Sequence, residues 1–594
     1  MTRQEPSSGA ILSASSASSL GERTTVPLLA LATFVLFSAL AMRPPTGSDA
    51  RYVEAAREMV ESGDLVVPHL AHVPYFEKPI LAYWLGAAAQ AVFGLSPLAA
   101  RLPSILATVG SVVATYGIGR ELRGPRFGLA GAAVFATMAI VPLTASVLLT
   151  DQPLAFFLTL ATFAYLRHER TAGRTWIWIA WAALGLAMLS KGPIALVLPA
   201  TSLFTWLAVT RRLGDWRRLR LLAGLAIVVA INFPWWALVW QRDPRFVDFF
   251  FIRMNLAAFF QDSVNHAQGP WYYFATLPFS VFPWTVIACG AIGVATVKEF
   301  VPAVRTLVTR RPAPSYDRSR LFLVCMIVPP FLFLTISASK LWYYALPLCP
   351  AIALLVADHV NRLSPNGRFL RNSLLGTAAL LAAVLIAGLH FAGSRSGLQT
   401  ASDTSWLVTA ATIGVCAVGA LIAGALLNRR RSAARGLAVA AAGTTLCLIP
   451  AYLISDDALV GTDASNVALR VAQVARPEDQ ILVSDRFVQD FTVQLAVKRR
   501  VGIVGRAREL GVGLFAEVTP PSKRLPLKPH DVASTNTPQN PWLYDLVRLR
   551  REWDGPRRIW LIWPNDDMEK LRDAGVVPVE LARDGEIIAL TNRP

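Results

Sequence analysis

The sequence predicts a mainly α-helical membrane protein with about thirteen transmembrane helices, interfacial helices in the first exterior loop, and a small C-terminal α/β exterior domain. Three observations predict this fold class. Of the 594 residues, 54% are apolar and 16% are charged, whereas about one quarter of a soluble protein is charged. Apolar runs of about 20 residues, long enough to cross a bilayer, alternate with short arginine-rich loops. These runs stop near Ser455, where shorter strand-like segments begin.

The charge pattern and the cysteines exclude two other classes of protein. The formal charge of +18 comes largely from arginines in short clusters between apolar runs, a pattern typical of membrane topology rather than of a nucleic-acid-binding surface. We therefore expect no nucleic-acid partner. The five cysteines all lie in apolar stretches, which favours small packing residues over a disulfide framework or a cysteine metal cluster.

The N-terminal segment, residues 1–24, is rich in serine and is predicted to be disordered and cytoplasmic. The apolar run that follows lacks a convincing cleavage site, so we interpret it as a retained first membrane helix. The transmembrane domain is predicted to cover residues 25–454.

Six loops rich in Lys and Arg are predicted to face the cytoplasm, because cytoplasmic loops carry an excess of these residues. Two apolar helices lie between successive basic loops and are joined by a loop poor in Lys and Arg. The alternation places the N-terminus in the cytoplasm and the C-terminus outside. The basic loops are marked by Arg120, Arg123 and Arg126; Arg167, Arg170 and Arg174; Arg211, Arg212, Arg217, Arg218 and Arg220; Lys298, Arg305, Arg310, Arg311, Arg318 and Arg320; Arg362, Arg368 and Arg371; and Arg429, Arg430, Arg431 and Arg435.

The segment from Ile80 to Leu95 would break this parity if it crossed the membrane. It is short and follows a long polar stretch, so we expect an interfacial helix inside an exterior loop at 43–98. Thirteen spans remain, at residues 25–43, 99–119, 127–147, 152–166, 175–190, 192–210, 219–240, 273–297, 321–338, 342–358, 373–393, 405–427 and 436–454.

Residues 455–594 are predicted to form the exterior (periplasmic) α/β domain, which is long enough for a core of its own. A stretch rich in Pro, Lys and Thr at 518–541 is expected to be a long loop. The expected strands are Gln480–Val483, Arg500–Val504, Arg558–Trp563 and Ile587–Leu590, and the expected helices are Trp542–Trp553 and Met568–Ala574.

This topology places an unusual number of ionisable residues on the exterior side. The first exterior loop is by far the most polar, and four other exterior turns contribute Asp151, Lys191, the stretch from Arg253 to His266, and Lys340 with Tyr343 and Tyr344. Ionisable groups near a bilayer are costly unless they are paired or functional. Their accumulation on one side therefore indicates a functional site.

Several of these exterior segments carry motifs that resemble the aminoarabinose transferases that modify lipid A, members of the C-type glycosyltransferase superfamily together with the protein O-mannosyltransferases. The motifs occur in the order of that family and cover nearly the whole chain. They are Ser48–Met59, Gly63–His69, Tyr75–Pro79, Leu149–Pro153, Ser190–Pro193, His266 ahead of Trp271–Tyr273, Ser339–Pro347, Arg506–Leu514 and Trp553–Pro556.

The resemblance implies an inverting glycosyltransferase that takes a sugar from an undecaprenyl (polyprenyl) phosphate and passes it to lipid A or another envelope glycolipid, at the outer face of the bacterial inner membrane. No nucleotide cofactor is expected. Two other functions stay open. A related enzyme would glycosylate Ser or Thr of exported proteins, and a transporter or flippase would share the many spans. A carrier, however, usually has charges midway through helices or inverted repeats, which we do not see.

The leaving group of such a transfer is a lipid phosphate whose negative charge grows as the sugar bond breaks. Fixed cations and hydrogen-bond donors would stabilise that charge. The candidates for binding the donor phosphate are Lys78, Lys191, Lys340 and Tyr344. The alternative for any of the lysines is snorkelling at the membrane interface.

Two aspartates are the catalytic candidates. Asp49 would act as general base or as an electrostatic partner of the acceptor, and Asp151 would orient the acceptor or the sugar. The alternatives are an ion pair between Asp49 and Arg51, and a helix N-cap at Asp151. The family usually has paired acidic residues here, whereas this chain has Ser48 before Asp49. Other residues of the first loop are expected to support the site, namely Arg51, Tyr52 and Tyr75.

Glu77 and His266 lie on exterior loops and could share one divalent metal ion, the one cofactor that the sequence raises. Two ligands make a weak site. The alternative is a contact between Glu77 and Lys78 or an arginine, with His266 held by hydrogen bonds.

Overall fold

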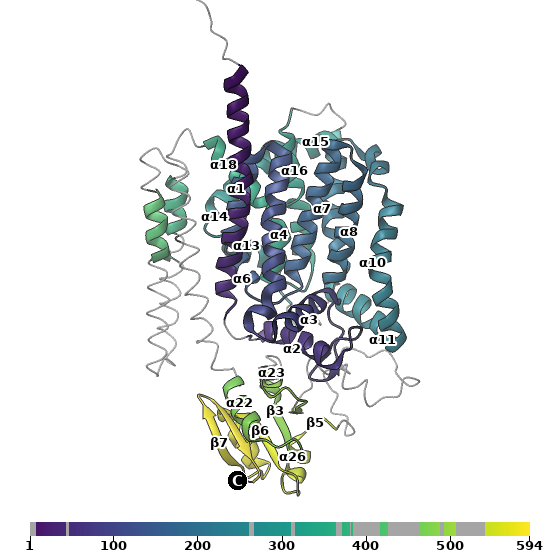
Figure 1. The fold of residues 1–594 in the computed structure, drawn as a ribbon, viewed down its shortest axis with the longest axis vertical. Coiled ribbons are helices and arrows are strands. Elements are labelled where there is room, and N and C mark those ends of the chain that lie inside the picture. The colour runs from purple at the N-terminus through teal and green to yellow at the C-terminus, as the bar shows by residue number, and fades with distance from the viewer. Residues whose placement is uncertain are drawn as a thin grey trace, which may run out of the picture.

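The structure, a computed structural model, shows a bundle of long helices with shorter helices and a sheet at one end (Figure 1). It describes residues 8–42, 45, 47–260, 267–309, 315–363, 371–379, 382–383, 416–425, 443, 464–487, 492–505 and 541–593. Within these residues the chain is mainly helical and carries a small C-terminal sheet, so this part of the predicted fold class is confirmed.

Five described helices or helix pairs are long and apolar enough to cross a membrane, by length and composition. The count of thirteen spans stays a prediction, because most of 373–454 lies outside the described residues. The five are Pro97–Arg123, Leu221–Arg242, Thr285–Thr309, Arg318–Ile336 and Trp342–Arg362, and the shorter apolar helices are Thr24–Leu40, Leu81–Phe93, Ile194–Val209 and Cys416–Ala425.

The elements of the first half of the chain follow the expected order. The interfacial helix expected from Ile80 corresponds to α3. In sequence the elements are α1 (Ser8–Leu40), α2 (Gly47–Ser62), β1 (His69–Leu70), β2 (Val73–Pro74), α3 (Leu81–Phe93), α4 (Pro97–Arg123), α5 (Pro125–Ala136), α6 (Ile140–Ala145), α7 (Asp151–Thr171), α8 (Arg174–Lys191), α9 (Ile194–Val209), η1 (Leu213–Leu219), α10 (Leu221–Arg242), α11 (Arg245–Val247), η2 (Asp248–Ala257) and α12 (Ala258–Phe260).

The later helices of the bundle are shorter and more often interrupted. They are α13 (Tyr272–Ser280), α14 (Thr285–Ala295), η3 (Thr296–Phe300), α15 (Val301–Thr309), α16 (Arg318–Cys325), α17 (Val328–Ile336), η4 (Trp342–Leu348) and α18 (Cys349–Leu363).

Three predictions of local structure were wrong. The helix α1 begins at Ser8, so most of the segment predicted to be disordered is helical; no proline occurs between Pro6 and Pro27 to stop it. The expected span 127–147 is divided into α5 and α6, and 273–297 into α13 and α14. The break between α5 and α6 contacts the break between α13 and α14. There the Ala139 N–H donates to the Phe282 carbonyl (2.8 Å) instead of to a carbonyl of its own helix.

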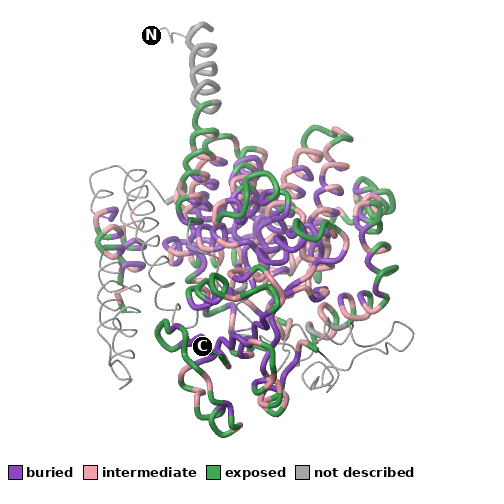
Figure 2. Tube along the Cα trace, turned by 60° about the horizontal axis from the view of Figure 1, so that its bottom comes forward, coloured by how far each residue is buried: buried purple, intermediate pink, exposed green. Residues whose placement is uncertain are grey.

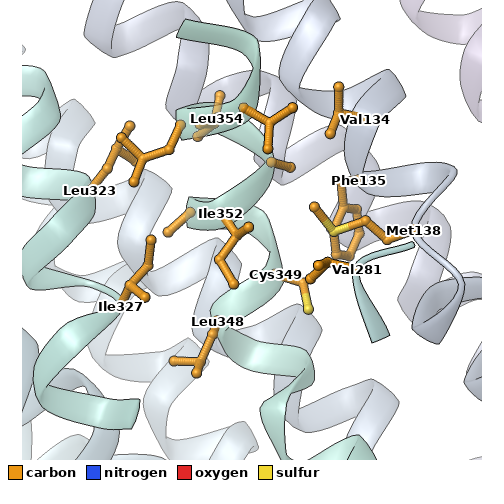
Figure 3. Close-up of a cluster of buried hydrophobic side chains, with 14 of the residues drawn as sticks. Val134, Phe135, Met138, Val281, Leu323, Ile327, Leu348, Cys349, Ile352 and Leu354 are labelled. Atoms are coloured by element: carbon orange, nitrogen blue, oxygen red, sulfur yellow. The ribbon is translucent and has the colours of Figure 1, made fainter. Parts of the chain in front are cut away.

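The centre of the bundle is a large apolar core, part of which is shown in Figure 3. In Figure 2 the buried residues lie at the centre of the molecule. Phe135, Met138 and Val281 pack from one side against Cys349 and Ile352 of α18. The helices α4 and α5 approach closely where Gly119 faces Gly128, since a Cβ on Gly119 would lie 2.5 Å from the Gly128 Cα. Small residues allow such contact between membrane helices.

Five of the six predicted basic loops have described residues, and these gather at one end of the bundle, opposite α2 and α3 (Figure 1). The sixth, at Arg429–Arg435, lies outside the described residues. Ion pairs and hydrogen bonds join the described loops one to the next. The charge pattern predicted that the loops face the same side, and the described ones are indeed neighbours. The links are Arg123 with Asp317 and Asp358, Arg320 and Arg362 with Asp358, Arg167 with Glu121, Arg212 with Glu169, and Arg211 with the Thr306 carbonyl.

The C-terminal domain, in its described residues, contains a six-stranded sheet of order β5-β4-β3-β6-β8-β7, parallel from β5 to β6 and antiparallel at β8 and β7. Its predicted exterior location stays a prediction. The four predicted strands correspond to β3, β4, β6 and β8. The start of the expected helix Trp542–Trp553 is instead the strand β5, and β7 and two helices were missed. The elements are α22 (Ser465–Val474), β3 (Gln480–Ser484), η6 (Asp485–Phe487), α23 (Thr492–Val497), β4 (Gly502–Val504), β5 (Leu543–Tyr544), α26 (Leu546–Trp553), β6 (Ile559–Pro564), η9 (Asn565–Asp567), α27 (Met568–Asp573), β7 (Val579–Asp584) and β8 (Ile587–Thr591).

The two faces of this sheet are covered differently. The helices α26 and α27 pack on one face through Leu549 and Leu571. The other face meets α22 and α23, and the same apolar cluster continues into the first exterior loop, where it includes Val53, Ala56 and Met59 of α2. We call this cluster the shared core. Because of it, the exterior domain and the first loop are packed as one unit at this end of the bundle.

The polar side of α2 carries a buried acid that should make stability depend on pH. Burial and the neighbouring Glu54 carboxylate raise the pKa of Glu58 to about 8, although the His72 N–H donates to it. The folded chain therefore holds this proton at pH values where the unfolded chain has lost it. The resulting stability is present below about pH 4.5 and is lost as the pH rises to about 8.

We expect the variant E58Q to remove most of this pH dependence. Between pH 5 and pH 8 the free energy of unfolding of the parent chain should fall by on the order of 1–3 kcal/mol, whereas that of E58Q should stay nearly constant. Thermal unfolding in detergent at each pH measures both. The control is E61Q, which changes a half-exposed carboxylate on the same helix and should keep the parent slope. Parallel pH curves for E58Q and the parent would contradict the prediction.

Candidate functional site

The centre of the candidate site is an ion pair between the ends of two neighbouring helices. Asp151 is the first residue of α7 and Lys191 the last of α8, and their carboxylate and ammonium groups are in contact. Both side chains are more than nine-tenths buried. The N-cap alternative for Asp151 was wrong, because Thr150 occupies that position and the Asp151 carboxylate faces Lys191.

Aromatic rings surround this ion pair. The Lys191 ammonium lies 3.7 Å from the centroid of the Tyr344 ring and 5.8 Å from that of Tyr343, so each ring offers its negative face to the cation. Asp151 is also close enough to interact electrostatically with the hydroxyl groups of Tyr273, Tyr343 and Tyr344. Three of the predicted site residues, Asp151, Lys191 and Tyr344, therefore meet in one place.

The predicted residues of the first loop form a second group around Tyr83. The Tyr75 hydroxyl donates to Glu77 (2.7 Å), and an Arg51 nitrogen lies 3.5 Å from that hydroxyl and 3.9 Å from Glu77. Tyr52 stacks on the ring of Tyr83 at 5.5 Å, and Tyr75 meets the same ring edge-on at 6.5 Å. Tyr83 lies in the apolar helix α3, where nothing in the sequence marked it as part of a site.

The two groups are neighbours. Arg51 and Tyr52 interact electrostatically with the hydroxyl of Tyr343, and Lys78 interacts in the same way with Lys191. Lys78 is partly exposed, and within the described part of the chain its ammonium forms no ion pair. The Lys191 charge is balanced by Asp151, whereas the Lys78 ammonium is left to interact with an anion.

Asp49 occupies a different environment from the one predicted. It is bound by Arg101 of α4, whose Nε lies 2.9 Å from the Asp49 carboxylate, and it accepts the Leu148 N–H at 2.6 Å. Arg101 also donates to the Ala41 carbonyl (2.7 Å), and both charged side chains are fully buried. Both carboxylate oxygens are therefore engaged, and the geometry favours an anchor for the first loop over a general base.

Lys340 is held by backbone groups. Its ammonium donates to the Gln268 carbonyl (2.8 Å) and to the Ser337 carbonyl at the end of α17. An ammonium has three N–H donors, so this pattern leaves little for a phosphate. Lys340 thus fits the role of a link between two exterior segments better than the predicted phosphate contact.

The predicted metal site is only partly visible, because His266 lies outside the described residues. Glu77 accepts a hydrogen bond from Tyr75 and faces Arg51, which is the alternative that the sequence left open. Among the described residues no group of three or more His, Cys, Asp or Glu side chains could hold a metal ion. The divalent ion stays a prediction, and no chemical step is derived from it.

Two buried residues beside the candidate site escaped sequence reasoning. Arg101 lies inside the expected span 99–119 and was not singled out, and Gln152 was noted only as part of the motif Leu149–Pro153. A charged residue inside an apolar segment was the available signal for Arg101, since such residues are costly unless paired.

Comparison with known proteins tests the family resemblance. The family described as dolichyl-phosphate-mannose-protein mannosyltransferase matches residues 28–250. An undecaprenyl phosphate-alpha-4-amino-4-deoxy-L-arabinose arabinosyl transferase of Pectobacterium atrosepticum is 29% identical over 548 residues, which cover 81% of this chain and 93% of the relative. The resemblance to the aminoarabinose transferases is confirmed. A second transferase of this type, from Pseudomonas fluorescens, is 32% identical over 401 residues, covering 64% of this chain and 65% of the relative.

A solved structure shows the same fold. The crystal structure of ArnT from Cupriavidus metallidurans bound to undecaprenyl phosphate superimposes with a TM-score of 0.78 and covers 96% of this chain and 98% of that chain, at 24% identity. The similarity thus includes the exterior domain as well as the bundle. The helices of this bundle that are long and apolar enough to cross a bilayer indicate a membrane protein.

Proposed function

We propose that this chain is an inverting glycosyltransferase that moves a sugar from an undecaprenyl phosphate donor to an envelope acceptor such as lipid A. One observation carries the proposal. Asp151, Lys191 and Tyr344 converge with Lys78, which forms no ion pair among the residues that the structure describes, at the end of the bundle that bears α2 and α3. The fold is shared with an undecaprenyl-phosphate-binding protein. Relatives named as arabinosyl transferases favour this function over the protein-glycosylating and transporter alternatives.

The chemistry follows from the charges. As the bond between sugar and phosphate breaks, negative charge grows on the phosphate oxygens, and the Lys78 ammonium stabilises it more in the transition state than in the ground state. Asp151, oriented by Lys191, accepts a hydrogen bond from the sugar or the acceptor. An acceptor phosphate of lipid A is already ionised, so it needs little help from a base.

The same proposal includes the topology. Thirteen spans, a cytoplasmic N-terminus and a periplasmic exterior domain place the site at the outer face of the inner membrane. The basic loops at the opposite end of the bundle support this orientation, because such loops stay in the cytoplasm.

The test is transfer by the purified chain in lipid vesicles. We expect undecaprenyl phosphate-4-amino-4-deoxy-L-arabinose, the sugar named in the relatives, and lipid A to yield glycosylated lipid A, detected by mass spectrometry. The D151N variant is the control and should form far less product than the parent. Comparison of envelope lipids and glycoproteins from cells with and without the chain tests the alternatives, because a sugar missing from proteins alone would overturn the lipid acceptor.

Metal analysis tests the predicted divalent ion. If Glu77 and His266 share an ion, the purified chain should contain about one equivalent of metal, and either E77Q or H266A should lower that content. Removal by a chelator should then reduce transfer, and added metal should restore it. A metal-free chain with full activity would contradict the prediction.

A further inference from the structure

The residue after Asp151 makes contacts that packing alone does not require. Gln152 is 1% exposed, and its side chain lies among three helices of the bundle. Its amide nitrogen donates to the Thr144 hydroxyl of α6, and its amide oxygen lies 2.9 Å from the Thr108 hydroxyl of α4. A buried amide is costly to leave without hydrogen-bond partners. The amide therefore joins the start of α7 to α4 and α6.

A second set of contacts holds the chain just before Asp151. The Leu148 N–H donates to Asp49, which is itself held by Arg101 of α4. The stretch from Thr144 to Gln152 is thus fastened at Thr144, at Leu148 and at Gln152, all through buried hydrogen bonds. Asp151 lies within this stretch, and its carboxylate reaches Lys191 on the adjacent helix.

We propose that Gln152 is a positioning residue for the transfer reaction, which acts by holding Asp151 at the distance from Lys191 and from the substrate that the reaction needs. The inference rests on the proposed function. A catalytic group displaced by up to about 1 Å from its position in the transition state lowers turnover by up to about 100-fold. Substrate binding, which depends on Lys78 and on the lipid contacts, should change little.

The experiment replaces Gln152 by methionine, which keeps the length and volume of the side chain but removes both hydrogen bonds. We expect Q152M to lower kcat by about 10- to 100-fold, with the KM for the polyprenyl phosphate donor within about threefold of the parent. The matched control is T159V on the same helix, because the Thr159 hydroxyl bonds only to the Ala155 carbonyl of its own helix (2.6 Å). T159V should leave kcat unchanged.

A double-mutant cycle separates positioning from a general loss of structure. Because Gln152 acts through Asp151, Q152M should add little to the loss already caused by D151N, whereas a merely structural effect would add in full. If Q152M folds poorly, T144V is the second variant, because it removes only the hydroxyl that accepts from the Gln152 amide. It should also lower kcat.

Two outcomes would overturn the inference while leaving the proposed function intact. One is a kcat for Q152M and T144V equal to that of T159V, with D151N strongly impaired. The other is a full additive loss in the double variant. A parent chain that transfers no sugar, or a D151N variant with full activity, would instead overturn the proposed function and this inference with it.

Discussion

Replacing Lys78 by methionine is expected to lower the rate of sugar transfer by about 100- to 1000-fold, the usual effect of removing one fixed donor from a developing negative charge. The reason is the charge balance of the site. Lys191 is neutralised by Asp151, and Lys340 donates to backbone carbonyls, whereas Lys78 forms no ion pair within the described residues. Steady-state kinetics with a saturating donor would measure the effect.

Two variants make the Lys78 experiment specific. K78R keeps the positive charge and should retain more activity than K78M. K298M removes an exposed lysine from η3 and should leave the rate unchanged. Equal rates for K78M and K298M would refute the role of Lys78 in binding the donor phosphate.

The variant D49N is expected to destabilise the chain by about 3–5 kcal/mol, because it leaves the Arg101 guanidinium buried without a counter-charge. Thermal unfolding in detergent would show the loss. The double variant D49N/R101M removes both charges and should recover much of the stability, since buried ion pairs can often be replaced by apolar groups at little cost.

The same pair of variants decides between the two roles of Asp49. An anchor predicts that transfer falls with stability in D49N and recovers with it in the double variant. A general base, as the sequence indicated, predicts a D49N chain of normal stability that transfers no sugar, and a double variant that is equally inactive. The second pattern would reject the anchor.

The membrane fold was largely predictable because its signals are local. A run of apolar residues between basic loops marks a helix without knowledge of its neighbours, and the basic loops that the structure describes do meet at one end of the bundle. The interruptions near Thr137 and Ser280 were not predictable, since each depends on the other through the contact between Ala139 and Phe282. The strand β5 is too short for a periodic pattern.

Site residues could be predicted where their expected side of the membrane was the signal. They could not be predicted where the role of a residue depends on which other residue it pairs with. Sorting residues by side brought out Asp151, Lys191 and Tyr344, which the structure places together. The same sorting could not show that Asp49 pairs with Arg101, 52 positions later in the chain. Nor could it show that Tyr83 lies between Tyr52 and Tyr75, because an apolar pattern reveals that a side chain is buried but not what it contacts.

The shared core also constrains how the protein is made. Synthesis proceeds from the N-terminus, so α2 leaves the ribosome long before α22, α23 and the strands against which it packs. Its apolar face, including Val53, Ala56 and Met59, must wait for partners that are made only after the residues of the bundle. A fault in the folding of the C-terminal domain would therefore leave the loop that bears Arg51 and Lys78 unfinished, however well the bundle itself had assembled.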